Sequence, residues 1–419
     1  MSGDLFAKVR AYESYAFRQE LEAQRLLPYF RVAEGPPTAV TMMGGVPRVN
    51  LGSSNYLGLS GDSRLTSAAH QANLRYGTSV NGSRLMNGTT ELHLRVEDAV
   101  ANWFGEEDAL VFGTGYTTNL GVISALVGDG DVVLCDAADH ASIVDGARLA
   151  RGRLLAFRHN RMDRLETLLR RASSTDAGVL VAVDTVYSMQ GDLSDIVAVT
   201  GLSRRYGARL LVDEAHAVGV LGPDGQGVAA LARLADGVDL RMGTLSKALG
   251  GSGGFVTGPA DVIDFLRVQA RAFMFTAAAP AGGLGAALAG IEIARSAEGE
   301  ERRERLAANA ARLRVALTEL GFDVAPAPVW ESGVEVQTPI LRVPAPDDMT
   351  AARTWRFLYD HGVYVNVALY PAVPRGRAQL RLCVMATHTA EHLERVVDAF
   401  TVLARKLTVR PAAADLVAG

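Results

Sequence analysis

Several short stretches of the chain carry residue types from which a small-molecule site could be built. The glycines of Gly113–Asn119 would let backbone N–H groups approach an anion, and a helix starting behind them favours negative charge. Asp213 offers a carboxylate for a cationic nitrogen, and His216 follows three residues later. Lys247 lies in a stretch rich in glycine, where small neighbours leave space for a bulky group on its amine. Each feature alone also suits a tight turn, a buried carboxylate or a surface lysine.

His140 adds an imidazole that could stack flat on an aromatic ring. It lies in Asp136–Ser142, directly after the apolar run Val132–Cys135. The order of a Gly-rich turn, a ring histidine, Asp-x-x-His and Ser-Lys is more specific than any one part. It matches the phosphate, phenol, ring nitrogen and aldehyde of pyridoxal 5′-phosphate (PLP). The residues therefore predict a PLP site.

Other ligand classes lack their motifs. Asp213–His216 spells DEAH, as in helicases, but the GxxxxGK[ST] phosphate loop that a helicase needs is missing. No GxGxxG follows an apolar strand, and neither HExxH nor spaced metal ligands occur. We expect no dinucleotide site and no metal.

The elements that must hold these residues follow an alternating pattern. Short, continuous apolar runs are separated by stretches of helical periodicity, which is typical of a mostly parallel sheet covered on both faces. Such sheets bind ligands beyond the carboxyl ends of their strands. We expect strands at Val132–Cys135, Val179–Val183 and Leu210–Val212 and helices at Glu91–Phe104, Leu120–Leu126, Leu165–Arg171 and Ile196–Tyr206.

The predicted fold class is α/β, with a smaller α+β domain after the large one. We expect a helical N-terminal arm over 1–48, with 1–35 helical, and a large ligand-binding domain over 49–290. A small domain follows over 291–408, beginning with a long helix from Glu298 to Leu320, and 409–419 would be a flexible tail.

Composition restricts the class of protein further. With 419 residues, 48% of them hydrophobic, the chain can bury a large core, unlike a disordered protein. The 42 Lys and Arg nearly balance the 46 Asp and Glu, so no overall basic field attracts nucleic acid or anionic lipid. Two cysteines, no signal-like start and no apolar run long enough for a membrane helix favour a cytoplasmic protein.

From about Asn50 to Leu403 the chain resembles the α-oxoamine synthases, a family of fold-type I PLP enzymes. The family includes 8-amino-7-oxononanoate synthase, 2-amino-3-ketobutyrate CoA ligase, 5-aminolevulinate synthase and serine palmitoyltransferase. Seven ordered motifs carry the resemblance: Ser53–Leu59, Gly82–Arg84, Asp139–Ser142, Tyr187–Asp192, Asp213–His216, Gly243–Lys247 and Leu380–Leu382.

The resemblance implies a role for each matching residue. Lys247 would bind the cofactor aldehyde, Asp213 the ring nitrogen, and His140 would stack on the ring. His216 and Ser188 would lie near the phenolic oxygen. The implied phosphate ligands are Gly115, Tyr116, Thr244 and, from a neighbouring subunit, Thr276, which implies a homodimer with shared active sites. The implied substrate ligands are Arg381 for the amino-acid carboxylate, and Asn55 and Arg31.

The implied reaction is a decarboxylative condensation. An amino acid would displace Lys247, whose freed amine removes the α-proton. The carbanion would attack an acyl thioester on CoA or on a carrier protein, releasing the thiol, and loss of CO2 would leave an α-amino ketone. Small residues around the site favour Gly, Ala or Ser as the amino acid.

The subfamily and other functions stay open at this point. Val80–Thr90 departs from the Gly-rich version expected in 8-amino-7-oxononanoate synthase, and Val384–Thr389 looks closer to serine palmitoyltransferase-like bacterial members. Gln190 replaces a common aspartate. We therefore expect a role in lipid or secondary-metabolite biosynthesis, with the biotin-pathway synthase and an aminotransferase as alternatives. A PLP-sensing regulator would need a DNA-binding domain, and an inactive partner subunit would lack Lys247.

Overall fold

The computed structural model describes residues 5–234, 237–329, 333, 335–370 and 372–409. All of the expected flexible tail except Val409 lies outside the described residues. The chain divides into two compact units, a larger one of residues 55–305 and a smaller one that combines 1–54 with 306–419. The domain boundaries expected near 48 and 290 stay predictions.

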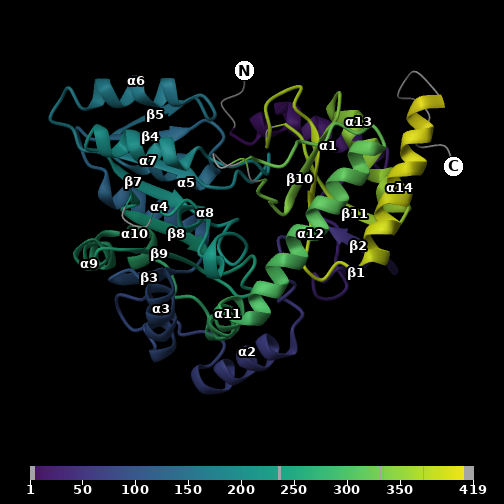
Figure 1. Cartoon of the computed structure of the whole chain (residues 1–419). Coiled ribbons are helices and arrows are strands. Elements are labelled where there is room, and N and C mark those ends of the chain that lie inside the picture. Colours follow the sequence, from purple (N-terminus) through teal and green to yellow (C-terminus); the bar gives the residue numbers. More distant parts are fainter. Residues whose placement is uncertain (1–4, 235–236, 330–332, 334, 371, 410–419) are drawn as a thin grey trace. The chain divides into compact units, whose positions relative to one another are not determined.

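The larger unit is built on a seven-stranded sheet of order β3-β9-β8-β7-β6-β4-β5 (Figure 1). Strands β8, β7, β6, β4 and β5 run parallel, and β9 is antiparallel to both of its neighbours. The mostly parallel sheet expected from the unbroken apolar runs is confirmed. The strands are β3 Asp108–Phe112, β4 Val132–Asp136, β5 Arg153–Phe157, β6 Val179–Asp184, β7 Arg209–Asp213, β8 Leu240–Thr244 and β9 Gly254–Gly258.

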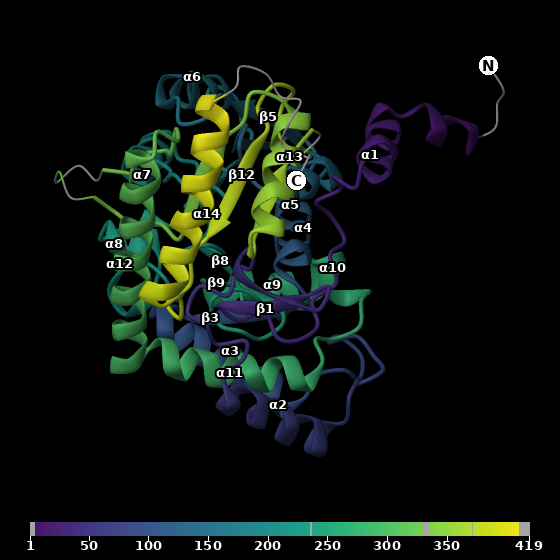
Figure 2. The ribbon, with the colours of Figure 1, turned by 90° about the vertical axis from the view of Figure 1, so that its right-hand side faces the viewer.

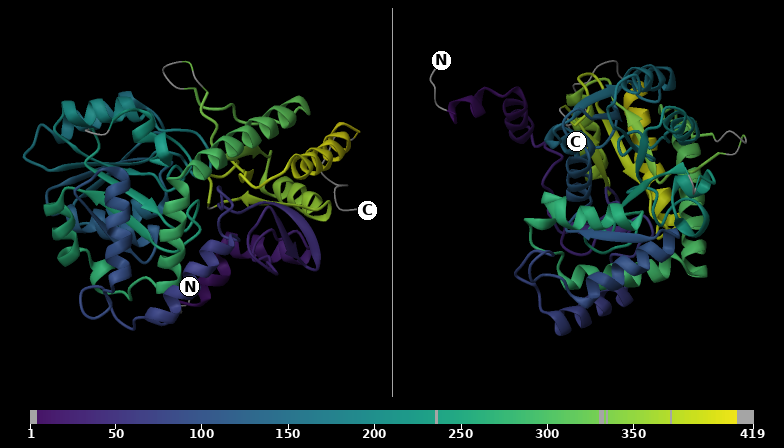
Figure 3. Two further views of the ribbon diagram at one scale, coloured as in Figure 1. Left: turned by 60° about the horizontal axis from the view of Figure 1, so that its bottom comes forward. Right: turned by 90° about the vertical axis from the view of Figure 1, so that its left-hand side faces the viewer.

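Helices cover the sheet of the larger unit because alternate side chains of each strand point to opposite faces. One face gives a continuous core in which Val133, Cys135 and Leu211 meet helices α4 (Gly115–Leu126), α5 (Ala141–Leu149) and α9 (Ala260–Gln269). Helices α6 (Met162–Ala172) and α7 (Ile196–Arg205) pack against each other and contact β4, β5 and β7 (Figure 3). The central strands β4 and β6 are therefore fully buried and apolar up to the aspartate that ends each of them, as expected for a covered sheet.

The remaining helices of the larger unit form its outer layer. Helix α11 packs on α2 and α3, and α12 begins in this unit and continues into the smaller one. Within the described part of the chain, no helix is both long and apolar enough to span a bilayer. These helices are α2 Ser63–Tyr76, α3 Glu91–Phe104, α8 Val228–Leu231, α10 Arg271–Met274, α11 Ala281–Ala294 and α12 Ala297–Glu319, with a short 3₁₀ turn, η2, at Pro223–Gly225.

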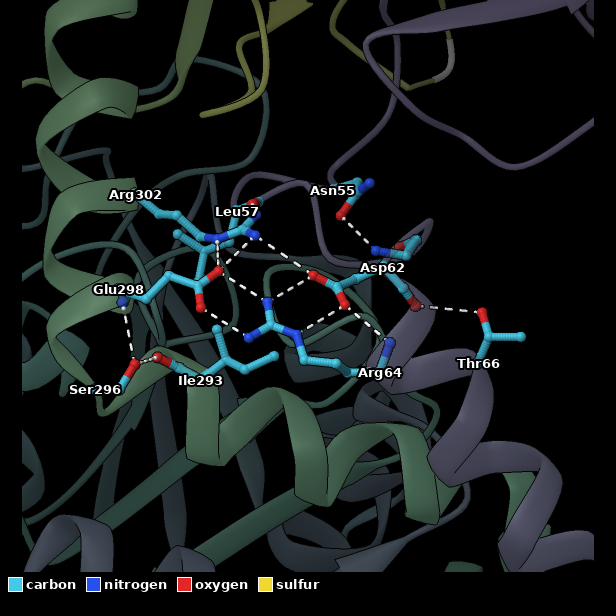
Figure 4. Close-up of polar contacts among 11 residues, drawn as sticks. Asn55, Leu57, Asp62, Arg64, Thr66, Ile293, Ser296, Glu298 and Arg302 are labelled. Carbon is cyan, nitrogen blue, oxygen red and sulfur yellow. Dashed lines mark hydrogen bonds and ion pairs between the residues drawn. The ribbon is translucent and has the colours of Figure 1, made fainter.

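A cluster of ion pairs ties the start of α12 to the start of α2 (Figure 4). Asp62 caps α2 and accepts from the Arg64 backbone N–H at 2.9 Å, while the Arg64 guanidinium binds both Asp62 and Glu298 at 2.8 Å. Arg302, one turn further along α12, binds Glu298 at 2.7 Å and donates to the Leu57 carbonyl at 2.7 Å. The loop that carries the Ser53–Leu59 motif is thus anchored to α12.

The smaller unit holds a five-stranded sheet of order β1-β2-β11-β12-β10. Helices α13 and α14 pack against its strands (Figure 2). Residues 1–4 of the helix expected over 1–35 lie outside the described residues, and the expectation is wrong beyond Ala23, because the chain turns at Arg25 (φ 57°). Residues 40–43 and 46–51 form two strands that pair with each other, and the second of them pairs with β11. The elements are η1 Ala7–Ala11, α1 Glu13–Ala23, β1 Val40–Met43, β2 Val46–Leu51, β10 Ile340–Pro344, α13 Asp348–Asp360, β11 Val363–Ala368, β12 Gln379–Cys383 and α14 Ala390–Val409.

Candidate active site

Polar residues gather where the parallel strands of the larger unit end. Asp136, Asp184, Asp213 and Thr244 are the last residues of β4, β6, β7 and β8. Asp184 pairs in register with Asp213, so the two carboxylates lie on neighbouring strands. This edge is where parallel sheets bind ligands.

Asp213 is buried, and two donors hold its carboxylate. Asn119 Nδ2 donates to Oδ2 at 2.7 Å, and the Ala215 backbone N–H donates to Oδ1 at 2.9 Å. The same Asn119 amide donates to Ser142 Oγ at 2.9 Å, and Ser142 lies 2.8 Å from His140 Nδ1. The carboxylate and the imidazole that the sequence singled out are therefore joined through two buried polar residues.

These hydrogen bonds define which nitrogen of the His140 ring carries the proton. The Ser142 backbone N–H donates to His140 Nδ1 at 3.3 Å, so Nδ1 is an acceptor, and the Ser142 hydroxyl 2.8 Å away donates to it as well. Desolvation by the surrounding protein lowers the pKa of His140. A neutral ring with its proton on Nε2 follows.

Lys247 lies beside His216, which is itself held in place. Lys247 Nζ is 3.1 Å from His216 Nε2, and His216 Nδ1 is 2.7 Å from the hydroxyl of the fully buried Tyr56. Tyr56 was missed as a site residue, although it lies inside the Ser53–Leu59 motif. Its side chain orients the imidazole that contacts the lysine amine.

The first turn of α4 forms the anion-binding part of this edge. The helix was expected from Leu120, but it begins at Gly115 because the Thr114 side chain caps it, accepting from Thr117 N. A Cβ on Gly115 would lie only 3.2 Å from Thr244 Oγ1, so this turn lies directly beside β8. The positive end of α4 and a strand-end hydroxyl thus lie together.

Tyr116 lies in the same turn and contacts His140. The two rings meet edge to face with centroids 6.2 Å apart, and the Tyr116 hydroxyl donates to Asp145 of α5.

Glu214, the residue after Asp213, is fully buried, and hydrogen bonds from the protein itself hold its side chain. Its carboxylate accepts from Thr185 Oγ1, Val228 N and Ala229 N. We interpret Glu214 as a structural anchor for α8.

The other predicted site residues lie elsewhere. Ser188 is in the turn after β6, and Thr276 lies on an exposed segment after α10. Asn55 is buried, and its Oδ1 accepts from Ser60 N at 3.1 Å, which shapes the turn that carries Tyr56. For these residues the predicted contacts with cofactor or substrate stay predictions.

Arg381 and Arg31 belong to the smaller unit. Arg381 is buried on β12, opposite Arg342 of β10 and Asn366 of β11. Arg31 stacks over the ring of Trp355 at 5.1 Å, and its buried Nε has no hydrogen-bond partner among the described residues. A cavity of about 270 Å³ is lined by Glu22, Arg25, Leu27, Arg31 and Arg356.

The residues at the strand ends fit PLP. The buried Asp213 carboxylate can hold a protonated ring nitrogen, and the α4 N-terminus with Thr244 can hold a phosphate. His140 presents a neutral ring, and Lys247 presents an amine beside an imidazole. No His, Cys, Asp or Glu cluster suited to a metal ion occurs among the residues that the structure describes.

Comparison with known proteins identifies the family. Residues 46–400 match the family described as aminotransferase class I and II. The 8-amino-7-oxononanoate synthase of Geobacter sulfurreducens is 43% identical, over 93% of this chain and 97% of that protein. The serine palmitoyltransferase of Caulobacter vibrioides is 39% identical, over 94% and 95%.

A solved serine palmitoyltransferase from S. paucimobilis, with bound PLP–myriocin, superposes with a TM-score of 0.90 at 35% identity. The match covers 97% of this chain and all of that one. The chain therefore belongs to the α-oxoamine synthases, PLP-dependent acyltransferases of the aminotransferase class I and II fold.

Proposed function

We propose that this α-oxoamine synthase joins a small amino acid, Gly, Ala or Ser, to an acyl thioester in lipid or secondary-metabolite biosynthesis. The observation that carries the proposal is the placement of Lys247 Nζ at 3.1 Å from His216, at the strand edge where Asp213 ends β7. PLP supplies an electron-accepting ring that stabilises negative charge on the substrate α-carbon. Side chains of this protein bind and orient the cofactor and substrates and transfer the protons.

Each side chain at the edge has a defined task in this proposal. The Asp213 carboxylate keeps the cofactor nitrogen protonated, and Asn119 keeps that carboxylate pointed at it. The Lys247 amine takes the α-proton and later returns one to the same carbon. His216, oriented by Tyr56, receives a hydrogen bond from the amine or donates one to it as the lysine gains and loses its proton.

We further propose that Arg381 binds the amino-acid carboxylate and that Asn55 and Arg31 contact substrate. A planar guanidinium suits a carboxylate because it can donate two parallel hydrogen bonds. The cavity beside Arg31 contains three arginines and one glutamate, a balance that favours an anionic group of the acyl donor. That group could be a phosphate of CoA or of a carrier protein, or a carboxylate at the far end of the acyl chain.

The assembly and location are part of the same proposal. We infer a cytoplasmic homodimer in which Ser188 binds the cofactor of its own subunit and Thr276 the cofactor of the neighbouring one. The exposure of Thr276 supports this, because it leaves the hydroxyl accessible. An acyl carrier protein is a second possible donor of the acyl group.

The test begins with the cofactor. Purified protein with PLP should absorb near-visible light, and Lys247→Ala should remove that band. Gly, Ala and Ser are then added separately and the spectrum is followed. A protein that binds PLP without forming a bond to Lys247 would contradict the proposal.

The second step identifies the acyl donor. Two thioesters are compared, a saturated long-chain acyl-CoA and an acyl-CoA with a terminal carboxylate, because the two relatives are named for a palmitoyl group and for an oxononanoate. Free thiol and CO2 are measured. We expect the long-chain donor to react, and the alternative synthase would prefer the carboxylate. Transamination without CO2 would instead indicate an aminotransferase.

A further inference from the structure

A second group of carboxylates lies behind His140, and the proposed reaction does not use it. Asp136 and Asp184 are buried at the ends of β4 and β6, and Asp139 lies between them in the turn that leads to His140. Three acidic side chains in such a place need compensation, because an unpaired buried charge is costly.

Hydrogen bonds from these carboxylates hold the turn before His140. Asp136 N donates to Asp139 Oδ2 at 2.6 Å, and Asp184 N donates to Asp139 Oδ1 at 2.8 Å. The Asp184 carboxylate in turn accepts from the His140 backbone N–H at 2.9 Å. Asp136 Oδ1 accepts from Ala138 N at 2.8 Å. The backbone position of His140 thus depends on where Asp136 and Asp184 lie.

Burial and mutual repulsion raise the pKa of Asp139 and of Asp184, whereas Asp136 has a cationic partner in His159, just after β5. Its Nδ1 lies 3.0 Å from Asp136 Oδ1 and its Nε2 lies 2.9 Å from Asp192 Oδ2. A carboxylate can only accept, so both ring nitrogens must donate, which requires an imidazolium. The neighbouring Asn160 N–H adds a 2.8 Å bond to Asp136 Oδ2, and the Tyr187 ring lies edge-on to His159 at 4.5 Å.

We infer that His159 is a positioning residue: its imidazolium, held between Asp136 and Asp192, fixes the turn that sets the angle of the His140 ring against the cofactor. This inference rests on the proposed function, because the ring that His140 faces is that of PLP. Without the cation, Asp136 would keep its backbone donors but lose its charged partner. The turn of residues 136–140 would then shift, and the His140 ring would tilt with it.

The inference predicts a pH dependence of a particular sign. Burial opposes the charge on His159, but the hydrogen bonds that its ring donates to Asp136 and Asp192 outweigh it and raise the pKa of His159 to about 9. The groups that face the ring are Asp136, Asp192 and the Tyr187 ring. A raised pKa means that the ion pair is complete below about pH 6.5 and is lost as the pH rises through about 9.

The experiment compares His159→Gln with His70→Gln, an exposed histidine on α2 outside the site. Holoenzyme is examined by visible circular dichroism, whose amplitude per bound PLP reports the asymmetry around the ring. The rate of α-proton exchange of Gly, Ala or Ser in D2O is measured on the same samples from pH 6 to 10. A thermal unfolding series without PLP, over the same pH range, separates stability from cofactor geometry.

We expect His159→Gln to change the dichroism per bound PLP and to slow the exchange about 10- to 100-fold, as for a displaced catalytic group. Both signals should fall in the wild type above about pH 9, while the variant shows no such step. His159→Arg, which cannot lose its charge in this range, should restore part of the rate and remove the step. His70→Gln should match the wild type.

Unchanged dichroism and unchanged exchange in His159→Gln would overturn the inference, even if the unfolding temperature fell, because His159 would then stabilise the fold only. In that case the wild type would still show its cofactor band, and the proposed function would stand. A wild type without any cofactor band would overturn the proposed function and this inference together.

Discussion

At the scale of single residues, the site depends on buried polar side chains that hydrogen-bond to other polar side chains of the site. Asn119 is fully buried, and it links Asp213 of one strand end to Ser142 of α5. Tyr56 has the same kind of role for His216. Their value lies in orientation, since a charged group that can rotate freely is a poor partner for a fixed ligand.

Asn119→Leu tests this role. The substitution preserves volume but removes the donor to Asp213, and an unsatisfied buried group costs about 1–3 kcal/mol. We expect that loss in urea unfolding together with weaker PLP binding in absorbance titrations. Asn102→Leu, on the exposed side of α3, is the control and should change stability by less than about 0.5 kcal/mol. Equal stability and equal PLP affinity of the two variants would contradict the role assigned to Asn119.

At the scale of elements, close approach between α4 and the sheet sets the position of the anion site. A Cβ on Gly254 of β9 would lie 2.5 Å from Gly115 Cα, at the first turn of α4. Real Cβ atoms do not approach backbone so closely, so even one methyl group would push the helix end away from β9. The ion pairs of Arg64 with Asp62 and Glu298 hold α2 and α12 together by charge rather than by close packing.

Gly254→Ala should therefore cost about 1–3 kcal/mol of stability, as for overpacked cores, and weaken binding of PLP through its phosphate. Gly201→Ala is the matched control, because nothing lies within 4 Å of its Cβ position inside α7. There we expect a gain of up to about 1 kcal/mol from helix propensity. Urea unfolding and PLP titration measure both. If the Gly254→Ala protein were as stable as the control, the contact between β9 and the first turn of α4 would not be tight.

The ion pairs of Figure 4 give a second element-scale prediction. Hydrogen bonds from Arg64 hold the pKa of Asp62 and of Glu298 at about 2. A lowered carboxyl pKa stabilises the fold above the unfolded values near 4, and the contribution is lost as the pH falls toward 2.

Glu298→Gln should make the free energy of unfolding depend less steeply on pH between about pH 4 and pH 2. The effect should be about 1 kcal/mol or less, since Glu298 and Arg64 are largely exposed. Glu304→Gln, exposed on the same helix, is the control and should keep the wild-type slope. Identical slopes for the two variants would rule out a measurable contribution from the cluster.

At the scale of the whole molecule, the chain forms two units with separate sheets. Lys247, Asp213 and His140, which we propose bind the cofactor, all belong to the larger unit, and Arg381, which we propose binds the amino acid, belongs to the smaller one. A ligand stabilises the state that binds it, by about 2.7 kcal/mol at 100 times its Kd. PLP alone should therefore stabilise the larger unit and leave the smaller unit largely unchanged.

Hydrogen exchange with mass spectrometry tests this division. PLP alone should slow amide exchange in residues 113–120, 136–146 and 240–250, with little change in β10, β11 and β12. Adding the amino acid should then slow exchange around Arg381. Slowing of the smaller sheet by PLP alone would contradict the assignment of cofactor binding to the larger unit.

Local pattern was enough to predict much of this protein. Apolar runs and helical periodicity predicted the strands ending at Asp136, Asp184 and Asp213 and the helix Glu91–Phe104, because both signals depend on neighbours in the chain. The ordered motifs also pointed to Lys247, His140 and His216. Folding was needed to show that Asn119 holds Asp213 and that His159 pairs with Asp136 and Asp192.

Those contacts could not be read from spacing. Asn119 and Asp213 lie 94 residues apart, and His159 and Asp192 lie 33 apart. Whether such residues meet depends on strand order and on which face of the sheet each side chain takes, and non-local packing decides both. The same limit explains the N-terminal region, where residues expected in a helical arm form strands because β1 pairs with β2 and β2 pairs with β11.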